Sequence, residues 1–136
     1  MEIIDFYVLD THSLIWYLVG DERLGQSAKV VLENENNKFV LPLIALAEAF
    51  DIVQKKRTKI PNVESLLQDV FADSRIKIQS LTIDILLESQ NALIIPEMHD
   101  RLITATALSL EKEGLSVAVV TKDSSIIESK LVEIVW

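Results

Sequence analysis

The chain has 136 residues, of which 13 are basic and 21 acidic, and 49% of the residues are hydrophobic. This length predicts a single globular domain over residues 1–136, and the apolar content is high enough to offset the chain entropy that would favour disorder. The lack of cysteine excludes disulfides, iron–sulfur clusters and thiol nucleophiles, and two histidines are too few for a three-histidine zinc site. A net charge of −8 opposes unspecific attraction to nucleic acid, so local charges must bind any phosphate ligand.

The sequence shows no sign of a membrane span or a secretion signal. No uninterrupted apolar run approaches the roughly 20 residues that cross a bilayer. The start of the chain, residues 1–5, has no basic region ahead of its apolar residues. We therefore expect a soluble, cytoplasmic protein without membrane association.

Short apolar runs and longer amphipathic runs alternate along the chain. The short runs are rich in branched and aromatic residues and predict strands at 6–9, 38–41, 76–78, 117–120 and 132–135. The amphipathic runs predict helices, with Ser27, Asn62 and Thr82 as N-caps and with Gly20 and Gly114 as helix ends. Apolar strands separated by helices are typical of a parallel sheet that is covered on both faces. We therefore predict an α/β protein, a three-layer α/β/α sandwich around a central parallel sheet.

Two aspartates each follow a predicted strand. Asp10 comes directly after the strand at 6–9, and Asp123 comes three residues after the strand at 117–120. In open parallel sheets, ligands bind beyond the carboxyl ends of the strands, so both carboxylates are expected to face one crevice. For either residue alone, turn or N-cap chemistry is the better explanation, because Asp performs both.

Glu48 is a carboxylate inside an otherwise apolar predicted helix. The residues three and four positions away share its face, and none of them is cationic. Asp51, in contrast, has Lys55 four residues further on and is predicted to form an ordinary surface pair. A carboxylate near an apolar interior is costly unless it is paired or bound to a cation. This favours a functional role for Glu48 over the alternative, a partly exposed side chain near a distant Lys or Arg.

Asp100 begins the helix predicted at 100–113, where N-capping explains it about as well as a function does. The four acids nevertheless stand on four elements spread over residues 10 to 123, and each is expected near the same end of the sheet. Clustered carboxylates repel one another unless a cation intervenes, and hard divalent ions prefer oxygen ligands. Together the acids predict a Mg²⁺ or Mn²⁺ site that is suited to phosphodiester hydrolysis.

These residues resemble the PIN-domain ribonucleases, and most closely the VapC-type toxins of bacterial and archaeal toxin–antitoxin pairs. The segment 8–16, Val-Leu-Asp-Thr-His-Ser-Leu-Ile-Trp, is similar to the family's opening motif. Glu48 matches the second acid of the family, Asp100 the third and Asp123 the fourth. The similarity covers nearly the whole chain, and the order of the four acids is its most specific feature.

The resemblance implies a PIN-like α/β/α fold, a Mg²⁺- or Mn²⁺-dependent endoribonuclease, frequent homodimerisation, and inhibition by a small antitoxin that occupies the active-site groove. It implies that the metal site consists of Asp10 and Asp100 as primary ligands and Glu48 and Asp123 as further acids, supported by Thr121 and Thr11. The sequence departs from the family in one place, since Met98-His99 precedes the third acid where Pro-Phe is common. The shape of that loop and its substrate contacts are therefore open.

Four basic residues gather within positions 55–59, an unusual density in an acidic chain. Cations favour helix C-termini because of the helix dipole, and a solvated helix end is the better explanation. The functional alternative is a phosphate-binding patch in which Lys55, Lys56 and Arg57 contact RNA. Arg101 is a further candidate for RNA contact, with an ion pair to Asp100 as its alternative.

The sequence thus favours an endoribonuclease, the toxin of a toxin–antitoxin pair, that hydrolyses RNA by means of metal-activated water. The alternative from another class is a non-catalytic PIN-like module that binds RNA or protein. A phosphoryl-transfer protein with Asp10 as nucleophile fits less well, because that chemistry commonly wants a second acid close to the first, and Thr11-His12 supplies none.

Overall fold

A computed structural model describes residues 3–136 of the chain. The elements of this range are, in chain order, β1 (Phe6–Leu9), α1 (Thr11–Val19), α2 (Gln26–Glu33), β2 (Phe39–Pro42), α3 (Leu43–Gln54), α4 (Val63–Ala72), β3 (Ile76–Gln79), α5 (Ile83–Glu88), the 3₁₀-helix η1 (Ser89–Ala92), α6 (Met98–Lys112), β4 (Val117–Val120), α7 (Ser124–Ser129) and β5 (Glu133–Val135).

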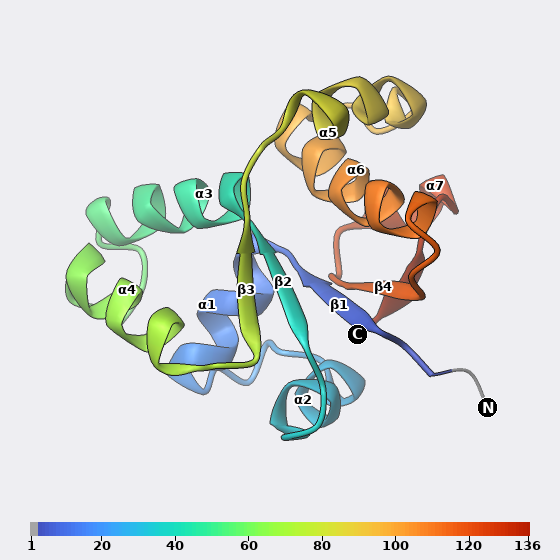
Figure 1. The fold of residues 1–136 in the computed structure, drawn as a ribbon. Helices are drawn as coiled ribbons and strands as arrows, with labels where there is room; N and C mark the ends of the chain where they lie inside the picture. The colour runs from blue at the N-terminus through green and yellow to red at the C-terminus, as the bar shows by residue number, and fades with distance from the viewer. Residues whose placement is uncertain (1–2) are drawn as a thin grey trace.

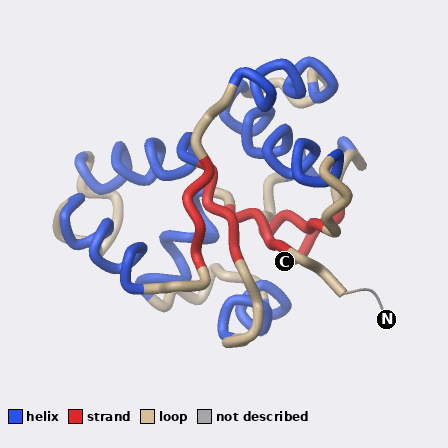
Figure 2. The backbone as a smooth tube through the Cα atoms, viewed as in Figure 1, coloured by secondary structure: helices blue, strands red, loops and turns tan. Residues whose placement is uncertain are grey.

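The five strands form one parallel sheet in the order β3-β2-β1-β4-β5. In Figure 1, β3 is the edge strand nearest the viewer, α3 and α4 lie on one side of the sheet, and α6 and α7 lie on the other. The backbone tube shows the strands enclosed between these helices (Figure 2). The predicted three-layer α/β/α sandwich is therefore confirmed.

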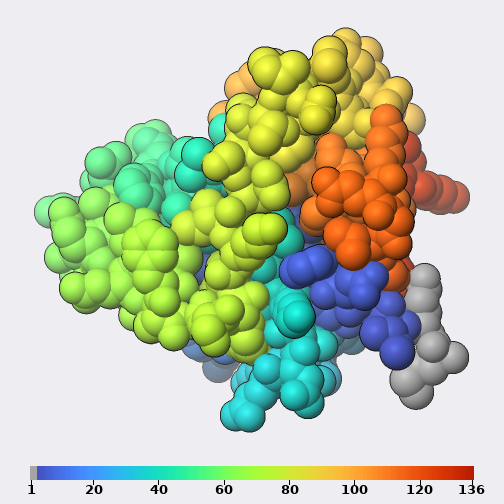
Figure 3. All heavy atoms as spheres, viewed as in Figure 1, coloured from blue at the N-terminus to red at the C-terminus, as the bar shows by residue number. Residues whose placement is uncertain are grey.

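The core lies where the helices meet the sheet. Strands β2 and β4 are buried along their whole length, as their unbroken apolar sequences predict for a sheet that is covered on both faces. In the space-filling view, the segment that leads into β1 reaches the surface between α2 and the end of α6 (Figure 3). No helix within residues 3–136 is both long enough and apolar enough to cross a membrane.

The helix boundaries follow local capping rules, with two differences from the sequence prediction. Asn62 and Thr82 cap α4 and α5 as predicted, because their side chains accept hydrogen bonds from backbone N–H groups three residues on. Ser27 is not an N-cap, because α2 already begins at Gln26, after Gly25. The segment expected as a turn after β4 contains the short helix α7, which Asp123 caps.

The register of the sheet brings the ends of two strands together. Leu9 at the end of β1 pairs with Val120 at the end of β4, so the residues that follow each strand leave the sheet at the same level. The Ser13 hydroxyl donates to the Val120 carbonyl oxygen at 2.6 Å, which ties the first turn of α1 to β4. The backbone thus places the loop at Asp10 beside the loop that leads to Asp123.

Candidate active site

Four acidic side chains line one pocket of about 480 Å³ at the carboxyl edge of the sheet. Asp10 follows β1, Glu48 lies on α3, Asp100 lies in the first turn of α6, and Asp123 stands between β4 and α7. The acids are up to 113 positions apart in the sequence, and only the folded topology gathers them. The sequence predicts that these four acids lie near the same end of the sheet, and their common position in one pocket agrees with this prediction.

Asp10 and Asp123 both cap helices as well as line the pocket. Asp10 Oδ1 accepts from the backbone N–H of Ser13 at 2.8 Å, and Asp123 Oδ1 accepts from that of Ile126 at 3.0 Å. The simple explanation from the sequence, N-capping, is therefore correct for both residues. Each cap bond uses only one carboxylate oxygen, so the structural role does not exclude a chemical one.

The surroundings of Asp10 disfavour its charged form. Burial raises the pKa of this carboxyl, and hydrogen bonds from the Ser13 and Thr121 side chains act in the opposite direction. Thr121 is fully buried, and its hydroxyl oxygen also accepts from the backbone N–H of Asp123 at 3.0 Å. Thr121 therefore connects the two acids that leave the ends of β1 and β4.

Glu48 is held from two sides of the pocket. The Thr11 hydroxyl donates to Glu48 Oε1 at 2.9 Å, and His99 Nδ1 lies 3.7 Å from Glu48 Oε2. Among the described residues, Glu48 has no Lys or Arg partner, and about a third of its side chain is exposed. Its carboxylate is thus not buried among apolar groups, and instead faces the pocket with a threonine and a histidine beside it.

Asp100 is not the N-cap of α6, which removes the main alternative explanation for it. Glu97 is the cap, because its Oε2 accepts from the backbone N–H of Asp100 at 2.9 Å. Burial raises the pKa of Asp100 to about 7, with further contributions from the negative charges of Asp123, Glu97, Glu48 and Asp10. A pKa in this range means that burial, together with the neighbouring negative charges, favours the protonated carboxyl near neutral pH.

The donor set suits a hard divalent cation, although the side chains are not drawn together around a common point. Within residues 3–136, no group of three or more acidic or histidine side chains could hold a metal ion as it stands. Mg²⁺ commonly takes only one or two protein carboxylates and keeps water in its other positions, so a three-residue group is not required. Asp10 and Asp100 line the same pocket and both have raised pKa values. A bound cation would offset the cost of keeping both carboxylates charged in this pocket, so the chemistry of the site fits a divalent ion.

The structure adds pocket residues that the sequence reading did not select. Glu97 is a fifth acid in the pocket, and its only sequence signal is its position three residues before Asp100, which is the spacing of a cap. Arg23 and Lys122 supply positive charge, and each lies 4.8 Å from the centre of the Trp16 ring. Trp136 packs edge-on against Trp16 and also against Gly25, where a Cβ atom would lie 2.5 Å from the Trp136 backbone.

The predicted RNA-contact residues are not all near the acids. Arg101 does not line the pocket, and among residues 3–136 its buried Nε has no hydrogen-bond partner. Lys55 pairs with Asp51 at 2.8 Å, so the predicted surface pair is confirmed. Lys56 and Arg57 line a neighbouring groove that shares residues with the pocket.

Comparison by sequence and by structure identifies the family. Residues 7–129 match the family model of the PIN domain, so the chain belongs to the PIN-domain family. No curated protein matches the chain significantly. The resemblance inferred from the order of the four acids is thus confirmed.

The fold is shared with solved VapC and VapBC structures. VapBC2 from Rickettsia felis, bound to a DNA fragment from its promoter, matches with a TM-score of 0.67 and 21% identity, over 95% of this chain and 96% of the other. VapBC-1 from nontypeable Haemophilus influenzae gives a TM-score of 0.65 and 18% identity, over 95% and 96%. VapC20 from Mycobacterium tuberculosis, a toxin that cleaves the sarcin–ricin loop, gives a TM-score of 0.66 and 14% identity, over 96% of this chain and 99% of the other. At these identities, the matches establish the fold.

Proposed function

We propose that this protein is a metal-dependent endoribonuclease that hydrolyses RNA phosphodiester bonds. The observation that carries the proposal is the convergence of Asp10, Glu48, Asp100 and Asp123, from four separate elements, on one pocket at the carboxyl edge of the sheet. The pKa of about 7 at Asp100 supports it, because burial and the neighbouring negative charges disfavour an unpaired carboxylate there, and a bound cation would offset both. Membership of the PIN-domain family provides independent support.

Asp10 and Asp100 are the proposed ligands of Mg²⁺ or Mn²⁺. When bound, the ion lowers the pKa of water and neutralises charge on the leaving oxygen. Glu48 and Asp123, which line the same pocket, are the proposed residues that orient water, and the Thr11 hydroxyl holds the Glu48 carboxylate by a hydrogen bond. Arg23 and Lys122 at the rim provide the local positive charge that an acidic chain needs in order to accept a polyanion.

We further propose that the protein is the toxin of a toxin–antitoxin pair, acting in the cytoplasm with a small antitoxin as partner. Support comes from the solved structures that share its fold, two of which are VapBC structures. Homodimerisation is supported by large apolar side chains that are exposed on and after α5. They include Ile83 (71% exposed), Leu87 (64%), Leu93 (57%) and Ile94 (70%).

The decisive experiment compares the parent protein with Asp10→Asn in RNA cleavage with Mg²⁺ or Mn²⁺. Asn retains a capping oxygen for α1, so the variant is expected to fold while losing at least about 100-fold in cleavage rate, since a charged group that acts on the reacting centre is removed. EDTA is expected to abolish the activity of the parent. Asp69→Asn, which alters an exposed acid on α4 that lines neither the pocket nor its neighbouring groove, is the matched control and should cleave like the parent.

The second candidate is a non-catalytic PIN-like module that only binds RNA or a protein. This alternative predicts RNA binding without cleavage in any divalent ion. If Asp10→Asn cleaves RNA as fast as the parent, the proposed roles of the acids are wrong. Cleavage that persists in EDTA would likewise contradict metal dependence.

A further inference from the structure

A second groove, of about 510 Å³, adjoins the acidic pocket. It lies between α1, the loop that follows α1, and the end of α3 with the loop that follows it. The groove and the acidic pocket share three lining residues, His12, Trp16 and Arg23. The two hollows are therefore neighbours across this short wall, and a chain-like ligand seated in the pocket can continue into the groove.

The groove is cationic in a protein of net charge −8. Its charged lining contains a single carboxylate, Asp21, and that group is already engaged by Arg23, whose Nε and Nη2 donate to it at 3.0 and 2.8 Å. The remaining charged side chains of the groove are all basic: Lys56, Arg57 and Lys59.

These cations are not explained by the end of a helix alone. Lys55 is the C-cap of α3 and is neutralised by Asp51, whereas Lys56, Arg57 and Lys59 form no salt bridge with any residue in the range 3–136. All three side chains are exposed, so they are free to meet a ligand.

The backbone that carries them is anchored. The N–H groups of Lys56 and Arg57 donate to the carbonyls of Val53 and Ile52, each at 3.0 Å, and Ile60 is buried beyond them. Arg23, on the other wall, is held by Asp21 and stacks over Trp16. Exposed cations on a fixed backbone are suited to a ligand with repeated negative charges, because the backbone loses little conformational entropy when the ligand binds.

We infer that this groove binds the phosphate backbone of the RNA strand on one side of the scissile bond. The inference rests on the proposed function, since it assumes that the scissile phosphate lies in the acidic pocket. The acids of the pocket repel an RNA chain, so binding requires an adjacent surface that attracts the phosphates on either side of the scissile bond. The cationic groove is such a surface, because it shares a wall with the pocket. A single strand fits this description, because groove cations that follow the backbone are typical of binding without sequence preference.

The test is RNA binding by a triple variant, Lys56→Gln/Arg57→Gln/Lys59→Gln, made in the Asp10→Asn background so that the probe stays intact. The probe is a fluorescent single-stranded RNA of about 16 nucleotides, measured by anisotropy over a range of salt concentrations. We expect the Kd to rise at least about 10-fold and the slope of log K against log salt to fall by about 2, since each lost phosphate contact removes roughly 0.7.

The matched control is Lys29→Gln/Lys38→Gln/Lys77→Gln, which removes the same charge from exposed lysines that line neither hollow. If both triple variants lose RNA affinity equally, the groove has no special role and the inference fails. It also fails if the groove variant binds RNA like its parent, or if polyglutamate binds the groove in preference to RNA, which would indicate a protein ligand.

Cleavage separates this inference from the proposed function. In the cleaving parent background, we expect the groove variant to lose most of the rate advantage of a long RNA over a dinucleotide, because the dinucleotide does not reach the groove. A parent that cuts no RNA overturns the proposed function. A parent that cuts, together with a groove variant of unchanged length dependence, overturns only the groove.

Discussion

At the level of single residues, most acids of the pocket make a local hydrogen bond and also face the negative charges of the other acids. Asp10 and Asp123 cap helices, and Glu48 accepts a hydrogen bond from Thr11. Asp100 differs from them, because it does not form the capping hydrogen bond that its position in the sequence suggests. His99 occupies a position where the family often has Phe, and it lies 2.7 Å from Glu97 and 3.7 Å from Glu48. The departure from the family pattern therefore adds a polar contact between two acids of the pocket.

The raised pKa of Asp100 predicts a pH-dependent stability. The pKa in the folded state, about 7, lies above the unfolded value near 4, so the fold favours the protonated form and loses stability as the pH rises from about 4 to 7. Asp100→Asn should therefore raise the free energy of unfolding at pH 8 in EDTA. After allowance for solvent near the carboxyl, we expect about 1 kcal/mol, or roughly 3–5 °C in Tm.

Thermal unfolding at pH 4 and pH 8 checks this expectation. The gain should be small at pH 4, where Asp100 is protonated in the folded state and about half protonated in the unfolded chain. Asp69→Asn, at an exposed position on α4, is the control and should show no such pH dependence. Equal stabilisation by Asp100→Asn at both pH values would show that the ionised Asp100 carboxylate is not the cause.

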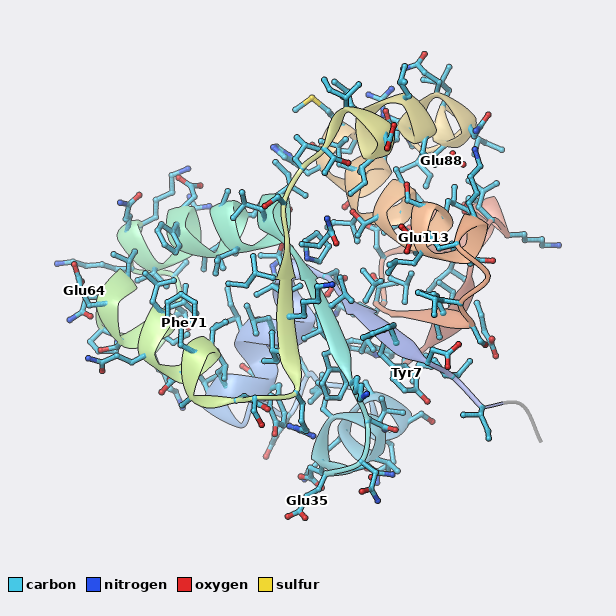
Figure 4. The ribbon with its side chains drawn as sticks, viewed as in Figure 1. Tyr7, Glu35, Glu64, Phe71, Glu88 and Glu113 are labelled. Atoms are coloured by element: carbon cyan, nitrogen blue, oxygen red, sulfur yellow. The ribbon has the colours of Figure 1, made fainter. Side chains whose placement is uncertain are left out.

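At the level of elements, the site depends on how helices are fixed relative to the sheet. The Ser13 hydroxyl joins α1 to β4, and Thr11 joins α1 to α3 through Glu48. Further from the pocket, Glu88 at the end of α5 pairs with Lys112 at the end of α6, and Figure 4 shows Glu88 beside α6. This ion pair connects α5 to α6, the helix that carries Asp100.

Lys112→Met should destabilise the protein at neutral pH. The Lys112 ammonium lowers the pKa of the buried Glu88 carboxyl, so the pair contributes stability above the unfolded pKa of Glu, and that contribution disappears as the pH falls through the lower folded value. Without Lys112 the Glu88 charge stays buried, and within the described part of the chain Asn91 is then its only side-chain partner, which should cost about 1–3 kcal/mol at pH 7.

Chemical denaturation at pH 7 and below pH 4 measures the effect. The difference between parent and variant should shrink at the lower pH, where Glu88 is protonated when its partner is lost. Lys55→Met breaks the exposed Lys55–Asp51 pair and should change stability by no more than about 0.5 kcal/mol. Similar losses in both variants would argue against a special contribution from burial of Glu88.

At the level of the whole molecule, opposite charges are separated over neighbouring hollows. The pocket gathers five acids, while the adjoining groove gathers four cations, and Arg23 and Trp16 stand between them. If a divalent cation occupies the pocket, an acidic protein can in this way offer that ion to one phosphate and its own basic side chains to the next phosphate. The net charge of the chain conceals this arrangement.

A divalent cation should stabilise the parent against heat, because it binds the folded pocket and not the unfolded chain. At 100 times the Kd, the gain is about 2.7 kcal/mol, which corresponds to a Tm shift of several degrees. Differential scanning fluorimetry with Mg²⁺ or Mn²⁺ measures it, with KCl of equal ionic strength as the reference. The double variant Asp10→Asn/Asp100→Asn should lose the shift, and a shift of unchanged size would place the cation elsewhere.

The fold class, the family and the order of the four acids follow from the pattern of residues along the chain. Strands such as Val117–Val120 are apolar at every position, and local patterns of this kind depend only on neighbours along the chain. For the same reason the capping roles of Asn62 and Thr82 were predictable. The helix α7 was missed because six residues give too little periodicity to distinguish a helix from a turn.

The surroundings of each acid follow from the folded arrangement and could not be predicted from its neighbours in the sequence. Glu97, rather than Asp100, caps α6, and the raised pKa of Asp100 arises from burial and from charges that are distant in sequence. The separation of Lys55, which is paired at the surface, from Lys56 and Arg57, which line the groove, depends on how one loop packs against α1. Solvation and electrostatic repulsion vary with distance in space, and distance along a chain does not specify them until the chain has folded.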